Sequence, residues 1–127
     1  MGINAFLSVG LGALLGAWAR WLLGLSLNAI FPLLPFGTLV ANVLGGYLMG
    51  LSIGLIAFGD MISPELRLFL ITGFLGSFTT FSTFSAESLN LFTRGEYGWA
   101  STHLLIHLFG SLIMTGLGLL TIHLLKS

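Results

Sequence analysis

The sequence predicts an all-α integral membrane protein with four transmembrane helices per chain, the third broken near its middle. Of the 127 residues, 56% are hydrophobic and only 6% are charged, and the mean hydropathy is +1.06. Soluble domains carry about 25% charged residues. Four apolar stretches, at residues 5–27, 36–58, 66–92 and 99–125, are long enough to cross a bilayer as helices. Their connections are short, so residues 1–127 are expected to form a single transmembrane domain.

The first stretch is interpreted as a working helix and not as a cleaved signal peptide. A signal peptide has a basic start and precedes a polar domain, whereas the first basic residue here is Arg20 and another span follows closely. Gly12 and Gly16 give this span a small face that suits helix packing. Arg20 lies toward the end of the span, where it either snorkels to the interface or forms a positive vestibule that draws anions.

The second span carries small and polar residues at intervals of four. Gly46, Gly50 and Gly54 form a row, and Asn42 and Thr38 extend it toward the N-terminal end. Close packing of small residues drives helix association in lipid. The Asn42 carboxamide needs a partner in hydrocarbon, so it either bonds to another helix or faces a polar pathway.

The third span starts with a capping signal and has a weak middle. Ser63 suits the N-cap of a helix and Pro64 its first position. Glycine weakens a helix and hydroxyl side chains compete for its backbone groups, so an unwound turn is expected near the middle, with a continuous helix as the alternative. Carbonyl groups freed by such a turn can bind a small cation. The residues concerned are Gly73, Gly76, Ser77, Thr79 and Thr80.

Two phenylalanines and a polar stripe follow this weak point. Phe81 and Phe84 are three residues apart and share a helical face, beside Thr80, Thr83 and Glu87 at i, i+3 and i+7. The positive edges of phenyl rings can attract an anion, although such pairs also serve only for packing. Glu87 is expected to constrain an ion path or accept hydrogen bonds, and not to bind an anion unless it is protonated.

The fourth span has a polar residue on each turn of one face, at His103, His107, Ser111 and Thr115. This repeat indicates either a second polar track or a series of interhelical hydrogen bonds. A His pair at this spacing can also hold a metal, but the sequence suggests no natural third ligand. The chain has no cysteine, which excludes disulfides and thiolate chemistry.

Lysine and arginine divide equally between the two predicted sides of the membrane. Arg67 and Lys126 fall on the side of the termini, whereas Arg94 and Arg20 fall on or near the other. The tie reflects either the small number of charges or insertion in both orientations. In the second case two copies would pair antiparallel, because no internal repeat could supply inverted symmetry.

Three stretches of the sequence resemble one known family. GFLGSFTTFSTFSAE at 73–87, GALLGAWARW at 12–21 and GTLVANVLGGYLMG at 37–50 are similar to the small fluoride channels of the Fluc or CrcB family. The likeness runs over essentially the whole chain. It implies a passive fluoride exporter of the bacterial inner membrane, built as an antiparallel dual-topology homodimer with two pores. The implied partners are fluoride, membrane lipid and a second copy, with no nucleic acid and no enzymatic activity.

The resemblance also implies roles for individual residues. The main-chain carbonyls of Gly76 and Thr79 match the pair that holds a structural Na⁺ at the dimer centre. Arg20 and Glu87 match the first-span arginine and third-span acid of the family. With the other members of the polar rows added, the expected fluoride pathway comprises Phe81, Phe84, Asn42, Ser82, Thr83, Ser111, Thr115, Thr38, His103 and His107.

One departure from the family concerns the fourth span. Family members tend to carry a tyrosine and a small or hydroxyl residue where His103 and His107 stand. Neutral imidazole donates through one nitrogen and gains positive charge on protonation, so conduction is predicted to depend on pH near the imidazole range.

Proteins of three other classes fit less well. A small proton-coupled exporter needs a carboxylate in the first span, which here has Arg20 instead. A purely structural subunit leaves the two polar stripes unexplained, and an enzyme would need a nucleophile–base pair or a catalytic metal set.

Overall fold

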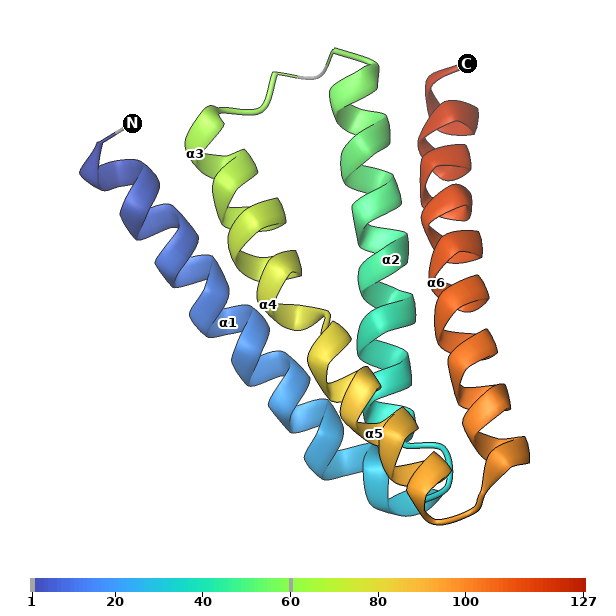
Figure 1. The fold of residues 1–127 in the computed structure, drawn as a ribbon. Coiled ribbons are helices and arrows are strands. Elements are labelled where there is room, and N and C mark those ends of the chain that lie inside the picture. Colours follow the sequence, from blue (N-terminus) through green and yellow to red (C-terminus); the bar gives the residue numbers. More distant parts are fainter. Residues whose placement is uncertain (1, 60) are drawn as a thin grey trace.

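The computed structural model describes residues 2–59 and 61–127, and this part of the chain is almost entirely helical. Four helical segments are long and apolar enough to cross a membrane: Ile3–Ile30, Phe36–Ala57, Pro64–Thr93 and Tyr97–Lys126. Successive segments alternate in direction, so both termini lie at the same end of the molecule (Figure 1). The predicted all-α fold with four spans is therefore confirmed. Asp60, in the predicted second connection, lies outside the described residues.

The first two spans are tied together at the connection between them. Helix α1 (Ile3–Leu27) continues into the 3₁₀ turn η1 (Asn28–Ile30) and is followed by α2 (Phe36–Ala57). The side-chain Oδ1 of Asn28 accepts a hydrogen bond from the backbone N–H of Thr38 at 3.2 Å. Asn28 thus satisfies an amide of the first turn of α2, as an N-cap residue ordinarily does.

The third span is assembled from four helical pieces. These are α3 (Pro64–Arg67), the π-helix η2 (Leu68–Leu75), α4 (Gly76–Phe78) and α5 (Phe81–Thr93). The Ser63 hydroxyl accepts a hydrogen bond from the backbone N–H of Leu66 at 3.1 Å and caps α3. This part of the third span begins as its sequence predicts.

An extended stretch separates α4 from α5. Thr79 has φ −86° and ψ 156°, and Thr80 has φ −149° and ψ 116°. The Thr80 hydroxyl accepts a hydrogen bond from the backbone N–H of Thr83 at 3.1 Å, which makes Thr80 the N-cap of α5. Thr80 therefore does not lie on a continuous helix with Thr83 and Glu87. The prediction that these three residues form one helical stripe was wrong for Thr80. Gly76, by contrast, has helical backbone dihedrals.

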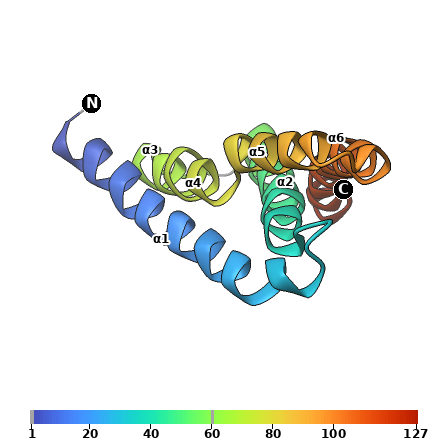
Figure 2. The ribbon, with the colours of Figure 1, turned by 60° about the horizontal axis from the view of Figure 1, so that its bottom comes forward.

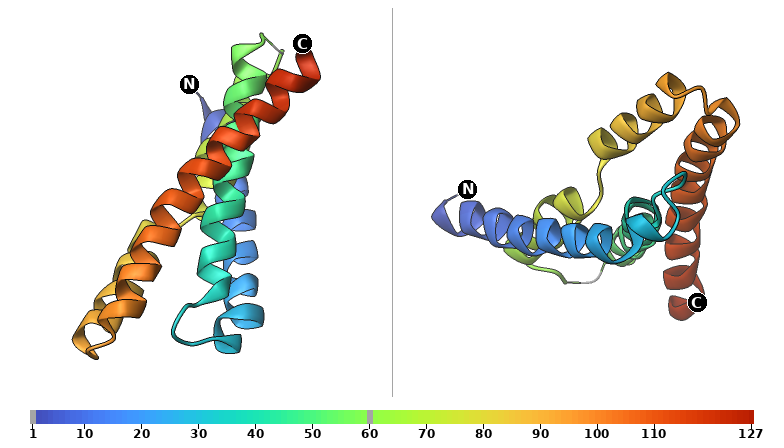
Figure 3. Two further views of the ribbon diagram at one scale, coloured as in Figure 1. Left: turned by 90° about the vertical axis from the view of Figure 1, so that its right-hand side faces the viewer. Right: turned by 90° about the horizontal axis from the view of Figure 1, so that it is seen from below.

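Helix α1 packs on η2 and α4, and α2 and α5 pack on α6 (Tyr97–Lys126) (Figures 2 and 3). Helix α1 also packs on α2, which joins these two sets of helices. A Cβ atom added to Gly12 would meet the carbonyl of Phe69, and one added to Gly50 would meet the carbonyl of Thr115. The glycine faces predicted for the first two spans are therefore packing surfaces within the chain.

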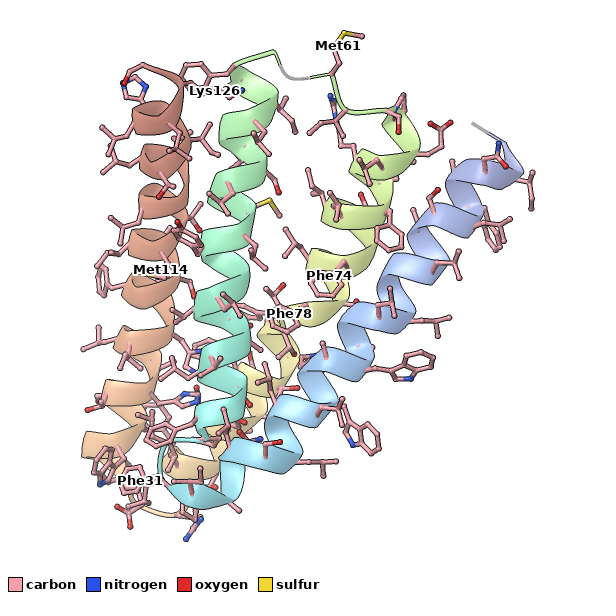
Figure 4. The ribbon with its side chains drawn as sticks, turned by 180° about the vertical axis from the view of Figure 1, so that it is seen from behind. Phe31, Met61, Phe74, Phe78, Met114 and Lys126 are labelled. Carbon is pink, nitrogen blue, oxygen red and sulfur yellow. The ribbon has the colours of Figure 1, made fainter. Side chains whose placement is uncertain are left out.

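Aromatic rings fill the space beside the extended stretch. The rings of Phe74 and Phe78 stack with centroids 5.4 Å apart, and both lie in the middle of the bundle (Figure 4). Phe78 is buried, whereas large apolar side chains such as Phe6 and Trp18 point outward, as expected for helices that face lipid.

Candidate functional site

A groove of about 750 Å³ lies beside the extended stretch, with walls from α2, α5 and α6. Among the described residues, those that line it include no Asp, Glu, Lys or Arg. The groove therefore brings together uncharged polar groups and aromatic rings from three spans. Its polar and aromatic lining residues are Asn42, Thr79, Thr80, Phe81, Phe84, His107, Ser111 and Thr115.

The two phenylalanines of α5 form an edge-to-face pair in this groove. The rings of Phe81 and Phe84 have centroids 5.5 Å apart and an interplanar angle of 64°. Phe84 also stacks on His103, with centroids 5.3 Å apart and an angle of 10°. Phe81 is 79% exposed. Phe84 is thus held by its neighbours, whereas Phe81 presents its ring to whatever covers the groove.

Asn42 fixes both the extended backbone and the orientation of His107. Its Oδ1 accepts a hydrogen bond from the Thr80 N–H at 2.7 Å, and its Nδ2 donates to the Thr80 carbonyl at 3.1 Å. These two bonds assign the positions of Oδ1 and Nδ2 in the Asn42 amide. The atom that lies 3.1 Å from His107 Nδ1 is therefore Nδ2, which donates a hydrogen bond to that nitrogen. The remaining His107 proton is thereby assigned to Nε2, a buried atom with no hydrogen-bond partner in the described part of the chain. Asn42 makes interhelical hydrogen bonds, one of the two uses predicted for it.

Behind the groove, Glu87 links α2, α5 and α6. Its Oε2 accepts a hydrogen bond from the Thr38 hydroxyl at 2.7 Å, and its Oε1 lies 3.1 Å from His103 Nε2. The expectation that Glu87 accepts hydrogen bonds is confirmed. The other ring nitrogen of His103, Nδ1, contacts the Ser88 hydroxyl at 2.9 Å, and the side chain is fully buried. His103 and Thr38 therefore belong to a polar network behind the groove.

Among the residues that the structure describes, Glu87, His103 and His107 form the one cluster with three potential metal ligands. Their potential ligand atoms lie within 4.8 Å of one another, so Glu87 has the position of a third ligand, which the sequence did not suggest. Helical spacing could not reveal it, because the contact depends on how α5 packs on α6. A metal-binding imidazole normally donates its second N–H to an acceptor, whereas His107 Nδ1 faces the Asn42 N–H donor. The orientation of His107 therefore fits a hydrogen-bonded network and not a resident metal.

The predicted hydroxyl residues fall in different places. Ser111 and Thr115 line the groove, and the Thr115 hydroxyl donates to the Ser111 carbonyl at 2.9 Å. Ser82 is exposed at the start of α5, where its Oγ lies 3.4 Å from Thr80 Oγ1. Thr83 is half-buried. Neither Ser82 nor Thr83 belongs to the set of residues that line the groove.

Two backbone carbonyls beside the extended stretch lack their usual helical donors. The Thr80 N–H, which would reach the Gly76 carbonyl in a helix, donates to Asn42. The Thr83 N–H, which would reach the Thr79 carbonyl, bonds to the Thr80 hydroxyl. Carbonyl oxygens released in this way are hard ligands of the kind that small cations prefer.

Arg20 contacts the third span at α4, just before the extended stretch. Its Nε donates a hydrogen bond to the Ser77 carbonyl at 3.0 Å, and the residue is half-buried. A cation near the C-terminal end of a helical segment is favoured by the helix dipole. The two roles predicted for Arg20, snorkelling and a positive vestibule, did not include this hydrogen bond. The sequence of the first span does not reveal which backbone carbonyl the Arg20 side chain reaches.

Comparison with known proteins assigns this molecule to a family. The family described as CrcB-like protein, Camphor Resistance (CrcB), matches residues 7–119. The chain belongs to the CrcB family. The resemblance of its motifs to that family is therefore confirmed.

Relatives within the CrcB family are similar along most of their length. A protein of Nitrosospira multiformis named fluoride-specific ion channel FluC is 53% identical over 122 residues, which cover 96% of this chain and 95% of the relative. A protein of the same name from Aromatoleum aromaticum is 60% identical over 116 residues, which cover 91% of this chain and 88% of the relative. These names describe ion channels and not enzymes, as expected for a CrcB protein. Four helices able to cross a membrane and bacterial relatives identify a multi-pass protein of the bacterial inner membrane.

Proposed function

We propose that this CrcB protein is a fluoride-selective passive channel that lets fluoride leave the cell across the bacterial inner membrane. The observation that carries the proposal is the groove, in which an edge-to-face phenyl pair lies beside uncharged polar groups. The relatives named fluoride-specific ion channels support the choice of ion.

The lining of the groove suits a small, strongly hydrated anion. Ring edges of Phe81 and Phe84 and the hydroxyl of Ser111 offer partial positive charge without a fixed cation. Many modest donors can replace the water around fluoride without creating a deep well in which it would stay. Asn42 acts indirectly, because its amide N–H groups are engaged with Thr80 and His107. A larger anion such as chloride could not approach several of these groups equally closely.

The pathway in this proposal is completed by a second copy of the chain. The groove is open on one side, and Phe81 is 79% exposed although it lies in a span. An antiparallel homodimer would cover both grooves and give two equivalent pores. The equal division of Lys and Arg agrees with insertion in both orientations. Since the chain has no native cysteine, a Ser63→Cys protein should be labelled by an impermeant thiol reagent from each side of the membrane; labelling from one side only would refute dual topology.

A structural sodium ion at the dimer centre is the remaining part of the proposal. The carbonyls of Gly76 and Thr79 would hold it together with their symmetry mates. The hydrogen bonds described above support this assignment, because they divert the amide N–H groups of Thr80 and Thr83 from these two carbonyls. The ion would supply positive charge that holds the two extended stretches together.

Fluoride efflux from liposomes tests the channel proposal. Purified protein is reconstituted with potassium fluoride inside, valinomycin starts the efflux, and a fluoride electrode records it, with potassium chloride liposomes in parallel. We expect fast fluoride release, little chloride release, and a strong reduction in a Phe81→Ile variant. Phe6→Ile is the matched control, because Phe6 is 74% exposed on α1, away from the groove. A folded dimer that releases no fluoride, or releases chloride equally fast, refutes the proposal.

A further inference from the structure

The hydrogen bonds around His103 determine where its first proton lies. The Ser88 hydroxyl has a single hydrogen, which it donates to the Phe84 carbonyl at 2.8 Å. Its oxygen also lies 2.9 Å from His103 Nδ1 and can only accept there. His103 Nδ1 therefore carries a hydrogen.

The opposite nitrogen of His103 requires a second shared proton. Nε2 lies 3.1 Å from Glu87 Oε1, and both a neutral imidazole nitrogen and a carboxylate oxygen are acceptors there. One hydrogen must lie between them to make this contact favourable. It belongs either to an imidazolium beside a carboxylate or to a carboxylic acid beside a neutral imidazole. In both cases the Glu87–His103 pair has no net charge.

The charge of this pair matters because of its position. His103 is fully buried, the Glu87 side chain is 17% exposed, and its carboxylate lies within 4.8 Å of a ligand nitrogen of His107, which lines the groove. Water and salt screen such a charge poorly. Of the described residues that come close to the pair, His107 on α6 also titrates, whereas Thr38 on α2 is uncharged. An ionised Glu87 without a protonated partner would therefore repel an anion in the groove.

We propose that His103 cancels the charge of Glu87 and so keeps the fluoride path free of a fixed negative charge; this inference rests on the proposed function. His103 is a positioning residue, because it acts on the anion through Glu87. It holds the shared proton against Oε1, while Thr38 binds Oε2 and Ser88 binds the far side of the imidazole.

A His103→Phe variant and its combination with Glu87→Gln test the inference. Phenylalanine keeps a ring to stack on Phe84 and removes both nitrogens. At about pH 7.5 we expect fluoride flux to fall about tenfold, as an added barrier of about 1.4 kcal/mol would cause. Protein-free liposomes give the fluoride leak that is subtracted from each trace.

The double variant separates charge from packing. Glutamine still accepts a hydrogen bond from Thr38 but has no charge, so His103→Phe/Glu87→Gln should recover a measurable flux at about pH 7.5. The inference is overturned if His103→Phe conducts like the wild type at about pH 7.5. It is also overturned if the double variant conducts no better than His103→Phe, since the imidazole would then act through its size or donors.

Nitrogen NMR of the wild-type protein provides a readout that does not depend on conduction. With ¹⁵N-labelled histidine, and with the His103→Phe protein used for assignment, we expect His103 Nδ1 to stay protonated throughout the pH range of the folded protein. An unprotonated Nδ1 overturns the inference even if the variants fail to fold. Wild-type protein without fluoride flux at any pH would refute the proposed function instead, and the NMR result would still test the hydrogen-bond assignment at His103 Nδ1.

Discussion

Replacing Asn42 with leucine should destabilise the protein at the extended stretch of the third span. Leucine has a similar volume but makes none of the three hydrogen bonds that Asn42 makes, two to Thr80 and one to His107. Hydrogen bonds between membrane helices contribute about 0.6 kcal/mol on average and up to about 1.7 kcal/mol each, so three should contribute about 2–5 kcal/mol. Fluoride flux should fall as well, because both Thr80 and the His107 ring lose their anchor.

Unfolding by SDS in mixed micelles, followed by far-ultraviolet circular dichroism, measures this loss. Asn90→Leu is the matched control, because Asn90 is exposed on α5, and its free energy of unfolding should change by less than about 0.5 kcal/mol. If Asn42→Leu costs no more than Asn90→Leu, the amide does not hold the third span, and the reasoning about its three hydrogen bonds fails.

Three further perturbations test the packing and the charges. Gly50→Ala should lower the free energy of unfolding by about 1–3 kcal/mol, because the new methyl group would press on the backbone of α6, whereas Gly116→Ala, which has open space, should not. Purification in N-methylglucamine in place of sodium should weaken dimerisation, seen by native mass spectrometry, if carbonyls of Gly76 and Thr79 hold Na⁺; an unchanged dimer would count against that ion. Arg20→Met should lower the thermal midpoint in detergent, since the C-terminal end of α4 loses its hydrogen bond, and an unaltered midpoint would show that the contact contributes nothing.

The spans could be predicted from the sequence because hydropathy and length depend on single segments. The predicted limits 66–92 and 99–125 differ from Pro64–Thr93 and Tyr97–Lys126 by only a few residues. The capped start at Ser63 also followed from local chemistry. The π-helix η2 was not predicted, because its hydrogen-bond register shifts without a distinct residue signal.

The sequence predicted which site residues share a face of one helix, but not which of them contact each other between helices. Spacing placed His103 and His107 on one face of a helix and Phe81 with Phe84 on one face of another. It could not show that Glu87 meets His103, because that distance is set by the rotation of α5 against α6. The tautomer of His107 was equally hidden, since it depends on an amide of α2.

The order of synthesis determines whether the third span has hydrogen-bond partners available when it enters the membrane. Its extended stretch has backbone groups that hydrocarbon cannot solvate. Two residues that bond to the backbone in or just before this stretch, Arg20 to the Ser77 carbonyl and Asn42 to Thr80, belong to helices synthesised earlier. When the third span is released from the insertion machinery, Arg20 and Asn42 are already in the membrane. The backbone groups that lipid cannot hydrogen-bond can therefore pair with side chains of the first two helices.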